Sequence, residues 1–126
     1  MLHHLALCSR DLAAATLMYD KLLLQLGYHR FLTNERVCGW IGAEPEILIY
    51  AARDPTVAPH RLYNPGIHHV AFCVNSCAEV DLVHDVALRA RFRILESPKF
   101  YPSYSATYYA VFFEDLDGIK LEVVLP

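Results

Sequence analysis

The sequence predicts an α+β fold in which two β-α-β-β-β modules form a curled mixed sheet around a central cleft. The first observation is an internal repeat, because residues 3–8 read HHLALC and residues 68–73 read HHVAFC. The second is that each copy precedes a stretch with apolar residues at helical spacing and then several strand-like stretches. Since the copies open the two halves of a 126-residue chain, we expect both halves to share one architecture.

In the first half, the repeat itself predicts a short strand at residues 5–8. The apolar residues that follow recur at helical spacing, and this predicts a helix that Ser9 or Asp11 can cap and Gly27 can end. Three strand-like stretches complete the module, at residues 28–32, 36–41 and 47–51.

The second half repeats this order after a linker with three prolines, residues 53–66. Ser76 with Glu79 three residues later forms a capping box at the start of the second helix. The strands of this half are expected at residues 67–74, 92–96, 108–113 and 120–125, with a loop at 97–106. The chain is thus predicted to be one domain, 1–126, with module one at 1–52 and module two at 67–126.

Composition excludes several classes of function. Apolar residues make up 55% of the chain and the net charge is −3, so we expect a packed core and no nucleic-acid partner. No apolar stretch approaches the length of a membrane span, and the N-terminus lacks the pattern of a signal peptide. The four cysteines show no zinc-finger spacing. These features predict a cytoplasmic protein with reduced thiols and no membrane partner.

The order of elements and motifs resembles the vicinal oxygen chelate superfamily, which includes glyoxalase I, extradiol dioxygenases and bleomycin-resistance proteins. The resemblance covers essentially the whole chain. The motifs that carry it are His4-Leu-Ala-Leu with Asp11-Leu12, Leu24 to Gly27, His69-Val-Ala-Phe, and Asp115-x-Asp117-Gly118-x-x-x-Glu122.

This resemblance implies a metal site formed by His4, His69 and Glu122. Two imidazoles and one carboxylate leave positions open for substrate oxygens, and the metal would be a divalent ion such as Fe, Mn, Ni or Zn. Side chains alternate along a strand, so we expect His3 and His68 to lie on the opposite face. The alternative is that these histidines are ordinary hydrogen-bonded residues. Glu122 lies among apolar residues, and a carboxylate buried there needs a partner.

One position departs from the glyoxalase I pattern. Aligning residues 47–50 with residues 120–123 puts Ile49 where that pattern has a second carboxylate, and Glu46 is then expected on the opposite face. Three protein ligands are closer to the dioxygenase branch in number and suit Fe(II) or Mn(II). Glyoxalase I activity itself is therefore less expected.

Aromatic residues are candidates for substrate binding. A tyrosine cluster precedes the last turn, and its members can form a wall or lid over the cleft or simply pack in the core and loop. Trp40 and Tyr50 are candidates for the opposite side. From these sets we select Trp40, Tyr50, Tyr104 and Tyr109 as candidate substrate-binding residues.

The function that these features favour is a small metal-dependent lyase, isomerase or dioxygenase acting on a small molecule with vicinal oxygens. One alternative is a metal-free protein of the same fold that sequesters a drug or metabolite. Another is a fold used only for assembly. The chain is expected to form a homodimer, and the two modules can pair within one chain or across the dimer.

Overall fold

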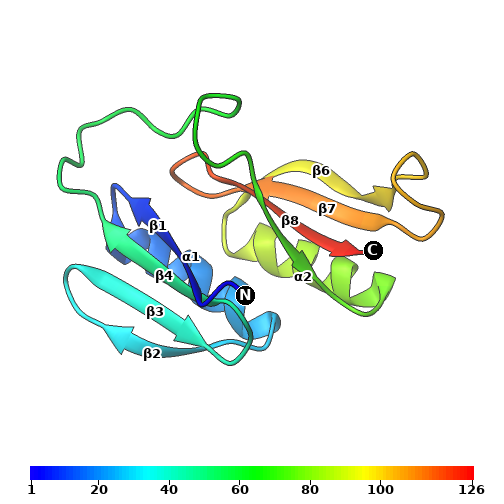
Figure 1. The fold of residues 1–126 in the computed structure, drawn as a ribbon, viewed down its shortest axis with the longest axis horizontal. Coiled ribbons are helices and arrows are strands. Elements are labelled where there is room, and N and C mark those ends of the chain that lie inside the picture. Colours follow the sequence, from blue (N-terminus) through cyan, green and yellow to red (C-terminus); the bar gives the residue numbers. More distant parts are fainter. The chain divides into compact units, whose positions relative to one another are not determined.

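The computed structural model of the chain describes all of residues 1–126 and contains the order β-α-β-β-β twice (Figure 1). The predicted α+β class and the two modules are confirmed. The chain divides into two compact units, an N-terminal unit (1–59) and a C-terminal unit (60–126). Their boundary falls inside the predicted linker.

The N-terminal unit is a four-stranded mixed sheet with one helix. Its elements are β1 (His4–Ser9), α1 (Leu12–Gln25), β2 (His29–Thr33), β3 (Val37–Ile41) and β4 (Glu46–Ala51). The strand order is β1-β4-β3-β2, in which β1 and β4 are parallel and the other pairs antiparallel. The register of the edge strand β2 shifts between Arg30 and Leu32.

Burial shows which face of this sheet the helix covers. Ile47 and Ile49 on β4 are each 1% exposed, and β4 contacts α1. Side chains alternate along a strand, so Glu46, Leu48 and Tyr50 point to the other face. Trp40 is the register partner of Ile47 and therefore lies on the helix side as well.

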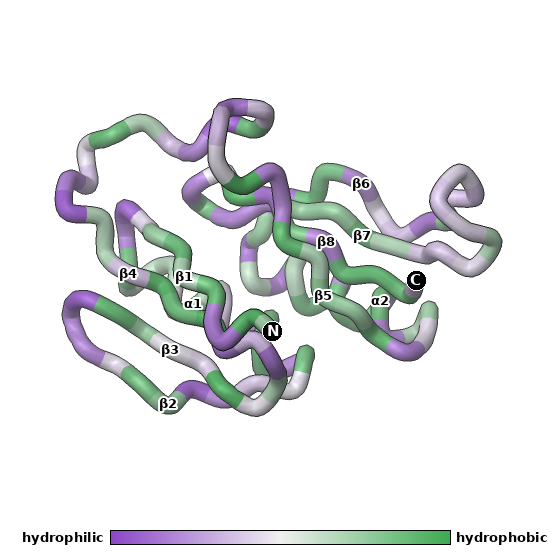
Figure 2. The backbone as a smooth tube through the Cα atoms, in the orientation of Figure 1, coloured by the Kyte–Doolittle hydropathy of each residue, from purple (hydrophilic) through white to green (hydrophobic).

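The C-terminal unit repeats the design. Its elements are β5 (Val70–Cys73), α2 (Cys77–Arg89), β6 (Arg93–Phe100), β7 (Tyr109–Glu114) and β8 (Lys120–Leu125). The order β5-β8-β7-β6 is again mixed, with β5 and β8 parallel. The inner strand β7 is coloured as mostly hydrophobic in Figure 2, and its Val111 and Phe113 are fully buried. Helix α2 packs on this unit's sheet through Val80, Val83 and Ala87.

Both helices begin where capping residues predict. Asp11 is the N-cap of α1 and accepts a bond from the Ala14 N–H at 3.0 Å. Ser76 caps α2 and accepts from the Glu79 N–H at 3.2 Å, and the Glu79 carboxylate accepts from the Asn75 N–H at 2.8 Å. The helices have 14 and 13 residues, and neither is long and apolar enough to cross a membrane.

Strand β6 is longer than the sequence predicts, because it continues through Pro98 to Phe100 instead of ending at residue 96. Its pairing with β7 shifts register between Ile94 and Glu96 and again between Glu96 and Lys99. These irregularities leave Pro98 outside the paired positions, where its missing N–H costs no ladder hydrogen bond. The strand therefore resumes beyond the proline.

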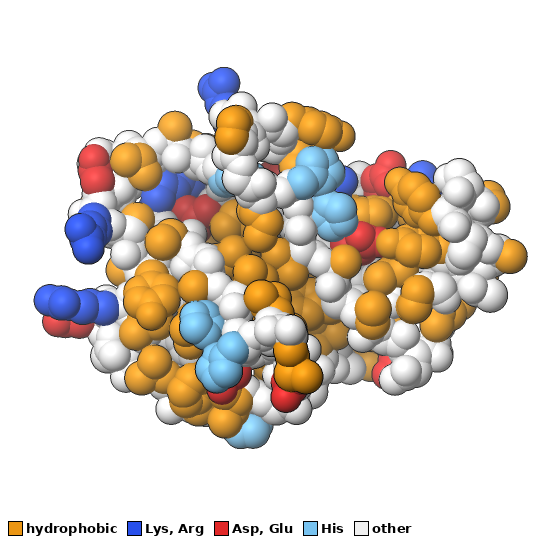
Figure 3. All heavy atoms as spheres, in the orientation of Figure 1, with side chains coloured by type: hydrophobic (Ala, Val, Ile, Leu, Met, Phe, Trp, Pro, Cys, Tyr) orange, Lys and Arg blue, Asp and Glu red, His pale blue; other side chains and the backbone are white.

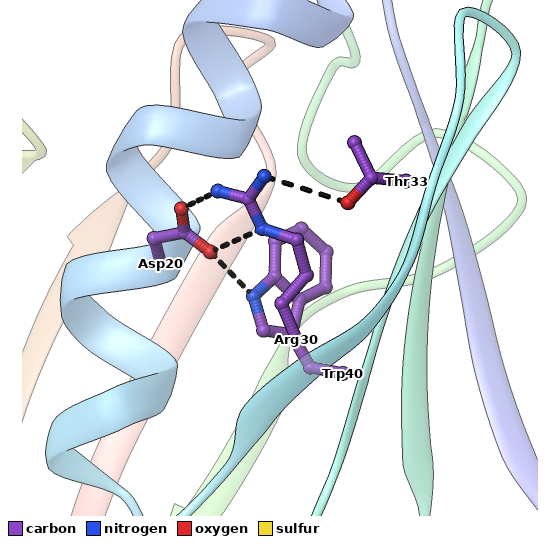
Figure 4. Close-up of polar contacts among 4 residues, drawn as sticks. All are labelled: Asp20, Arg30, Thr33 and Trp40. Carbon is purple, nitrogen blue, oxygen red and sulfur yellow. Dashed lines mark hydrogen bonds and ion pairs between the residues drawn. The ribbon is translucent and has the colours of Figure 1, made fainter.

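A polar cluster holds β2 and β3 to α1 in the N-terminal unit (Figure 4). The Trp40 Nε1–H donates to Asp20 Oδ1 at 2.8 Å, and the Arg30 guanidinium donates to both oxygens of the same carboxylate. Trp40 is 1% exposed and its ring also contacts Tyr19, with centroids 6.3 Å apart. Asp20 thus supplies the acceptor that a buried indole needs.

We predict that Asp20→Ala lowers the free energy of unfolding by about 1–3 kcal/mol, because the buried indole N–H loses its acceptor. Urea denaturation followed by the fluorescence of Trp40, the sole tryptophan, measures this change. The control is Arg30→Gln, which removes an ion pair whose side chains are 35% and 31% exposed and should cost less than about 1 kcal/mol. Equal losses in the two variants would show that the ion pair, and not the indole bond, holds the cluster.

Candidate functional site

The two histidine pairs of the repeat occupy matching places, at the start of each parallel edge strand. His4 is the first residue of β1, and His69 immediately precedes β5. The Nδ1 atoms of His3 and His4 are 2.9 Å apart, and those of His68 and His69 are 2.7 Å apart. Figure 3 shows histidine side chains exposed on the visible face.

The contact within each pair corrects the expectation that His3 and His68 point away from their neighbours. Alternation holds only inside a strand, and these residues precede β1 and β5. The rings of His68 and His69 instead meet edge to face, with centroids 5.0 Å apart. Sequence reasoning therefore missed His68 as a partner of His69.

Glu122 is the centre of the polar contacts in the C-terminal unit. It lies on β8 between the fully buried Leu121 and Val123 and is itself only 2% exposed. Its Oε2 is 3.1 Å from His69 Nε2, and its Oε1 accepts a 2.6 Å hydrogen bond from the Tyr108 hydroxyl. A buried carboxylate requires a polar partner, and Glu122 has two, His69 and Tyr108.

A cavity of about 730 Å³ opens beside this carboxylate and lies entirely within the C-terminal unit. We call it the tyrosine pocket, because Tyr63, Tyr101, Tyr104 and Tyr108 line it together with Phe112. Its polar side chains include His68, His69, Glu96, Lys120 and Glu122. The pocket therefore combines aromatic walls with groups of both charges.

The tyrosines contact one another and the carboxylates beneath them. Tyr101 and Tyr104 stack with centroids 5.8 Å apart, and Tyr104 meets Tyr108 at 5.1 Å. Tyr101 donates a hydrogen bond to Glu96. Burial and this bond raise the pKa of Tyr101, while burial and the bond to Glu122 raise the pKa of Tyr108. Both phenols are therefore held in their neutral, hydrogen-donating form.

The candidate aromatic residues fall in different places. Tyr104 lines the tyrosine pocket and is 65% exposed, and Tyr50 is 43% exposed on the face of β4 away from α1. Trp40 lies in the core of the N-terminal unit. Tyr109 is on the α2 side of β7, where its hydroxyl donates to Asp81 at 2.8 Å. Its neighbour Tyr108, which lies outside the candidate set, is the one that contacts Glu122.

Strand register corrects the alignment of the two halves. Ala6 is opposite Leu48 in the first sheet, and Ala71 is opposite Glu122 in the second. Leu48, and not Ile49, is therefore the counterpart of Glu122. Ile49 points to the helix, whereas Glu46 lies on the same face as Leu48 and pairs in register with His4. The conclusion that no carboxylate occupies the counterpart position still holds, because leucine cannot bind a metal.

The geometry of His69 and Glu122 fits two ligands of one metal ion. Donor atoms about 2.0–2.2 Å from an ion, at right angles to each other, lie about 3 Å apart, and His69 Nε2 and Glu122 Oε2 are 3.1 Å apart. Their outer atoms, His69 Nδ1 and Glu122 Oε1, contact His68 and Tyr108, as outer partners of metal ligands do. No group of three His, Cys, Asp or Glu side chains converges closely enough to hold a metal ion. His4 belongs to the other unit, so its place in the set stays a prediction.

Comparisons with known proteins agree with this architecture. A family model described as the Glyoxalase/Bleomycin resistance protein/Dioxygenase superfamily matches residues 1–123. The uncharacterized protein YqjT of Bacillus subtilis is 30% identical over 127 residues, which cover 99% of this chain and 98% of that protein.

Two solved structures have the same fold over the whole chain. A protein of Bacillus halodurans, provisionally assigned as a glyoxalase, superposes with a TM-score of 0.84 at 26% identity, over 100% of this chain and 96% of its own. A glyoxalase/bleomycin resistance protein of Albidiferax ferrireducens has a TM-score of 0.82 at 21% identity, over 100% and 99% of the two chains.

Tyr108→Phe is predicted to lower the free energy of unfolding by about 1–3 kcal/mol, because Glu122 stays buried with one donor fewer. Chemical denaturation monitored by circular dichroism measures the loss. Tyr104→Phe is the matched control, since the Tyr104 side chain is exposed and does not bond Glu122. Equal losses of unfolding free energy in the two variants would show that the hydrogen bond to Glu122 is not the source of the stability that the Tyr108 hydroxyl provides.

The Tyr109–Asp81 bond gives a prediction for alkaline pH. That hydrogen bond, with partial burial, raises the pKa of Tyr109 to about 12. The folded state favours the neutral phenol, so the stabilisation is complete below pH 10 and is lost between about pH 10 and 12. Tyr109→Phe should therefore be less stable at neutral pH and lose less stability than wild type over that window. Tyr63→Phe, at an exposed position, should behave as wild type in urea denaturation at each pH.

Proposed function

The chain belongs to the Glyoxalase/Bleomycin resistance protein/Dioxygenase superfamily, and from this membership we propose that it is a metal-dependent enzyme. Its substrate is a small molecule with two adjacent oxygen atoms. The proposed ligands are His4, His69 and Glu122, and the proposed metal is Fe, Mn, Ni or Zn. The observation that supports this most directly is the 3.1 Å approach of His69 Nε2 to Glu122 Oε2.

Each proposed ligand of the C-terminal unit is oriented by a neighbour. His68 contacts Nδ1 of His69, which leaves Nε2 directed at Glu122. Tyr108 engages Oε1 of Glu122 and leaves Oε2 directed at His69. When bound, a divalent ion would supply a Lewis acid that polarises the substrate oxygens. The Tyr104 phenol, which bonds neither Glu96 nor Glu122, would donate a hydrogen bond to those oxygens. The aromatic walls of the tyrosine pocket would limit access of water.

The ligand count bears on the type of reaction. Leu48 at the counterpart position of Glu122 supplies no fourth ligand. A set of three leaves positions open for two substrate oxygens and a further small ligand. We therefore favour ring cleavage or another reaction of a catechol-like or α-hydroxycarbonyl compound over isomerisation of a glutathione hemithioacetal.

We also propose that the protein is a homodimer. In a dimer, His4 would meet the His69–Glu122 pair either of its own chain or of the partner chain. Mixing His4→Ala with Glu122→Gln distinguishes these arrangements. If the ligands cross the dimer, mixed dimers contain one site with both mutations and one intact site, so metal binding returns. If the ligands come from one chain, every site in the mixture stays defective.

A metal-free binding protein is the second candidate function. One observation favours it: His69 and Tyr108 each contact one oxygen of Glu122, so partners from the protein itself satisfy this buried carboxylate. The tyrosine pocket would then hold a drug or metabolite through its aromatic walls and polar side chains, with no metal needed. We place either protein in the cytoplasm, which the four unpaired cysteines support.

The metal site gives the main prediction. Wild-type protein should bind Mn(II), Fe(II), Ni(II) or Zn(II) in calorimetric titration, and His4→Ala, His69→Ala and Glu122→Gln should each weaken binding at least about tenfold. His29→Ala is the matched control, because His29 is an exposed strand histidine remote from these motifs. If wild type and His69→Ala bind the metal ions with the same affinity, the proposed metal site is wrong and the metal-free binding protein is favoured.

Turnover decides between reaction types. A panel of catechols, α-hydroxycarbonyl compounds and the glutathione hemithioacetal would be assayed with each of the four metals. Product from a catechol or α-hydroxycarbonyl compound supports the proposal. Efficient isomerisation of the hemithioacetal would show that the missing fourth carboxylate does not limit this chain.

A further inference from the structure

Lys120 places a positive charge in the tyrosine pocket without a carboxylate bound to it. Its ammonium lies 4.6 Å from the centroid of the Phe112 ring, and none of the ion pairs in the structure includes it. Glu96 is the other acidic residue of the pocket besides Glu122, and it is already engaged by the Tyr101 hydroxyl and by Lys99 at 3.7 Å. The Tyr101 hydrogen bond and the charges of Lys99 and Lys120 lower the pKa of Glu96, so Lys120 lies near this carboxylate. No ion pair joins the two, and the ammonium of Lys120 is therefore available to a ligand.

Its position relates it directly to the proposed metal ligands. Lys120 and Glu122 are two residues apart on β8 and so lie on one face, separated by about 6.6 Å along the strand. Phe112 is paired with Glu122 in register, and its ring meets that of His69 with centroids 6.4 Å apart. One aromatic ring thus contacts both the cation and a proposed metal ligand. A planar molecule of one ring's size can span the two.

The duplicated module shows that the fold does not require a cation here. In the N-terminal unit, the residue two before Leu48 on the same face is Glu46. In the C-terminal unit, the residue two before Glu122 is Lys120. The same backbone position therefore carries opposite charges in the two units, and the positive one is the one that faces the tyrosine pocket.

We propose that Lys120 binds the carboxylate of a small organic acid whose planar body lies within the tyrosine pocket. The proposal rests on the proposed function in one respect, namely that the acid also has two adjacent oxygens that would face His69 and Glu122. The contact between its carboxylate and Lys120 needs no metal. The proposed substrates are therefore molecules with two adjacent oxygens that also carry an anionic group. That group is separated from the two oxygens by about the width of one aromatic ring.

The test compares two probes that differ only in the carboxylate, catechol and 3,4-dihydroxybenzoate. Their affinities are measured by calorimetry without oxygen, for metal-free and Mn(II)-loaded protein. Wild type should bind the acid about tenfold more tightly than catechol, as a hydrogen-bonded charge pair provides. Lys120→Gln should remove this preference while its affinities for catechol and Mn(II) stay unchanged.

Lys99→Gln is the matched control. Lys99 also lies over a tyrosine ring, 5.0 Å from the centroid of Tyr101, but it is paired with Glu96. This variant should keep the preference for the acid. Equal binding of the two probes by wild type, a preference that survives Lys120→Gln, or no binding of either probe would each overturn the proposal.

These outcomes separate the two proposals. A wild-type protein that does not bind Mn(II) but still prefers the acid through Lys120 would reject the metal site and support the anion contact. A protein that binds Mn(II) through His69 and Glu122 but shows no Lys120-dependent preference would support the metal site and reject the anion contact.

Discussion

The burial of the Glu122 carboxylate constrains the whole C-terminal unit. A charge that is 2% exposed within an apolar strand costs much free energy unless neighbours compensate for it. Tyr108 and His69 provide the compensation, and each brings further residues with it. Tyr104 packs on Tyr108, while His68 contacts His69. The walls of the tyrosine pocket are thus arranged by the need to satisfy one carboxylate, whether or not an ion joins it.

The duplicated elements could be predicted from the sequence, because repeat, helical spacing and capping residues all act locally. Strand register could not be predicted with the same certainty. Residues 47–50 are all apolar or aromatic, so their letters alone do not fix which one matches Glu122. The pairing of β4 with β1 decides it, and a shift by one residue moved the counterpart from the buried Ile49 to Leu48.

Side-chain partners that are distant in sequence explain the remaining differences at the site. Alternation states that Tyr108 and Tyr109 point to opposite faces, but not which face the helix covers. Asp81 on α2 binds Tyr109 and thereby leaves Tyr108 to Glu122. Trp40 is a candidate for a ligand wall by residue type alone, and Asp20, twenty residues earlier, accepts its indole N–H in the core of the N-terminal unit. No local pattern in the chain indicates either contact.

The irregular pairing of β2 and β6 has a consequence for association between molecules. Each is the last strand of its sheet, and the register of each is broken, at Arg30 to Leu32 in β2 and twice around Glu96 in β6. A regular outer strand offers a template for the strands of another molecule, which is how edge-to-edge aggregation starts. Bulges and Pro98 disrupt that template. The protein can therefore contain a large share of apolar, β-rich sequence without exposing a regular edge strand at β2 or β6 to which another molecule could add a strand.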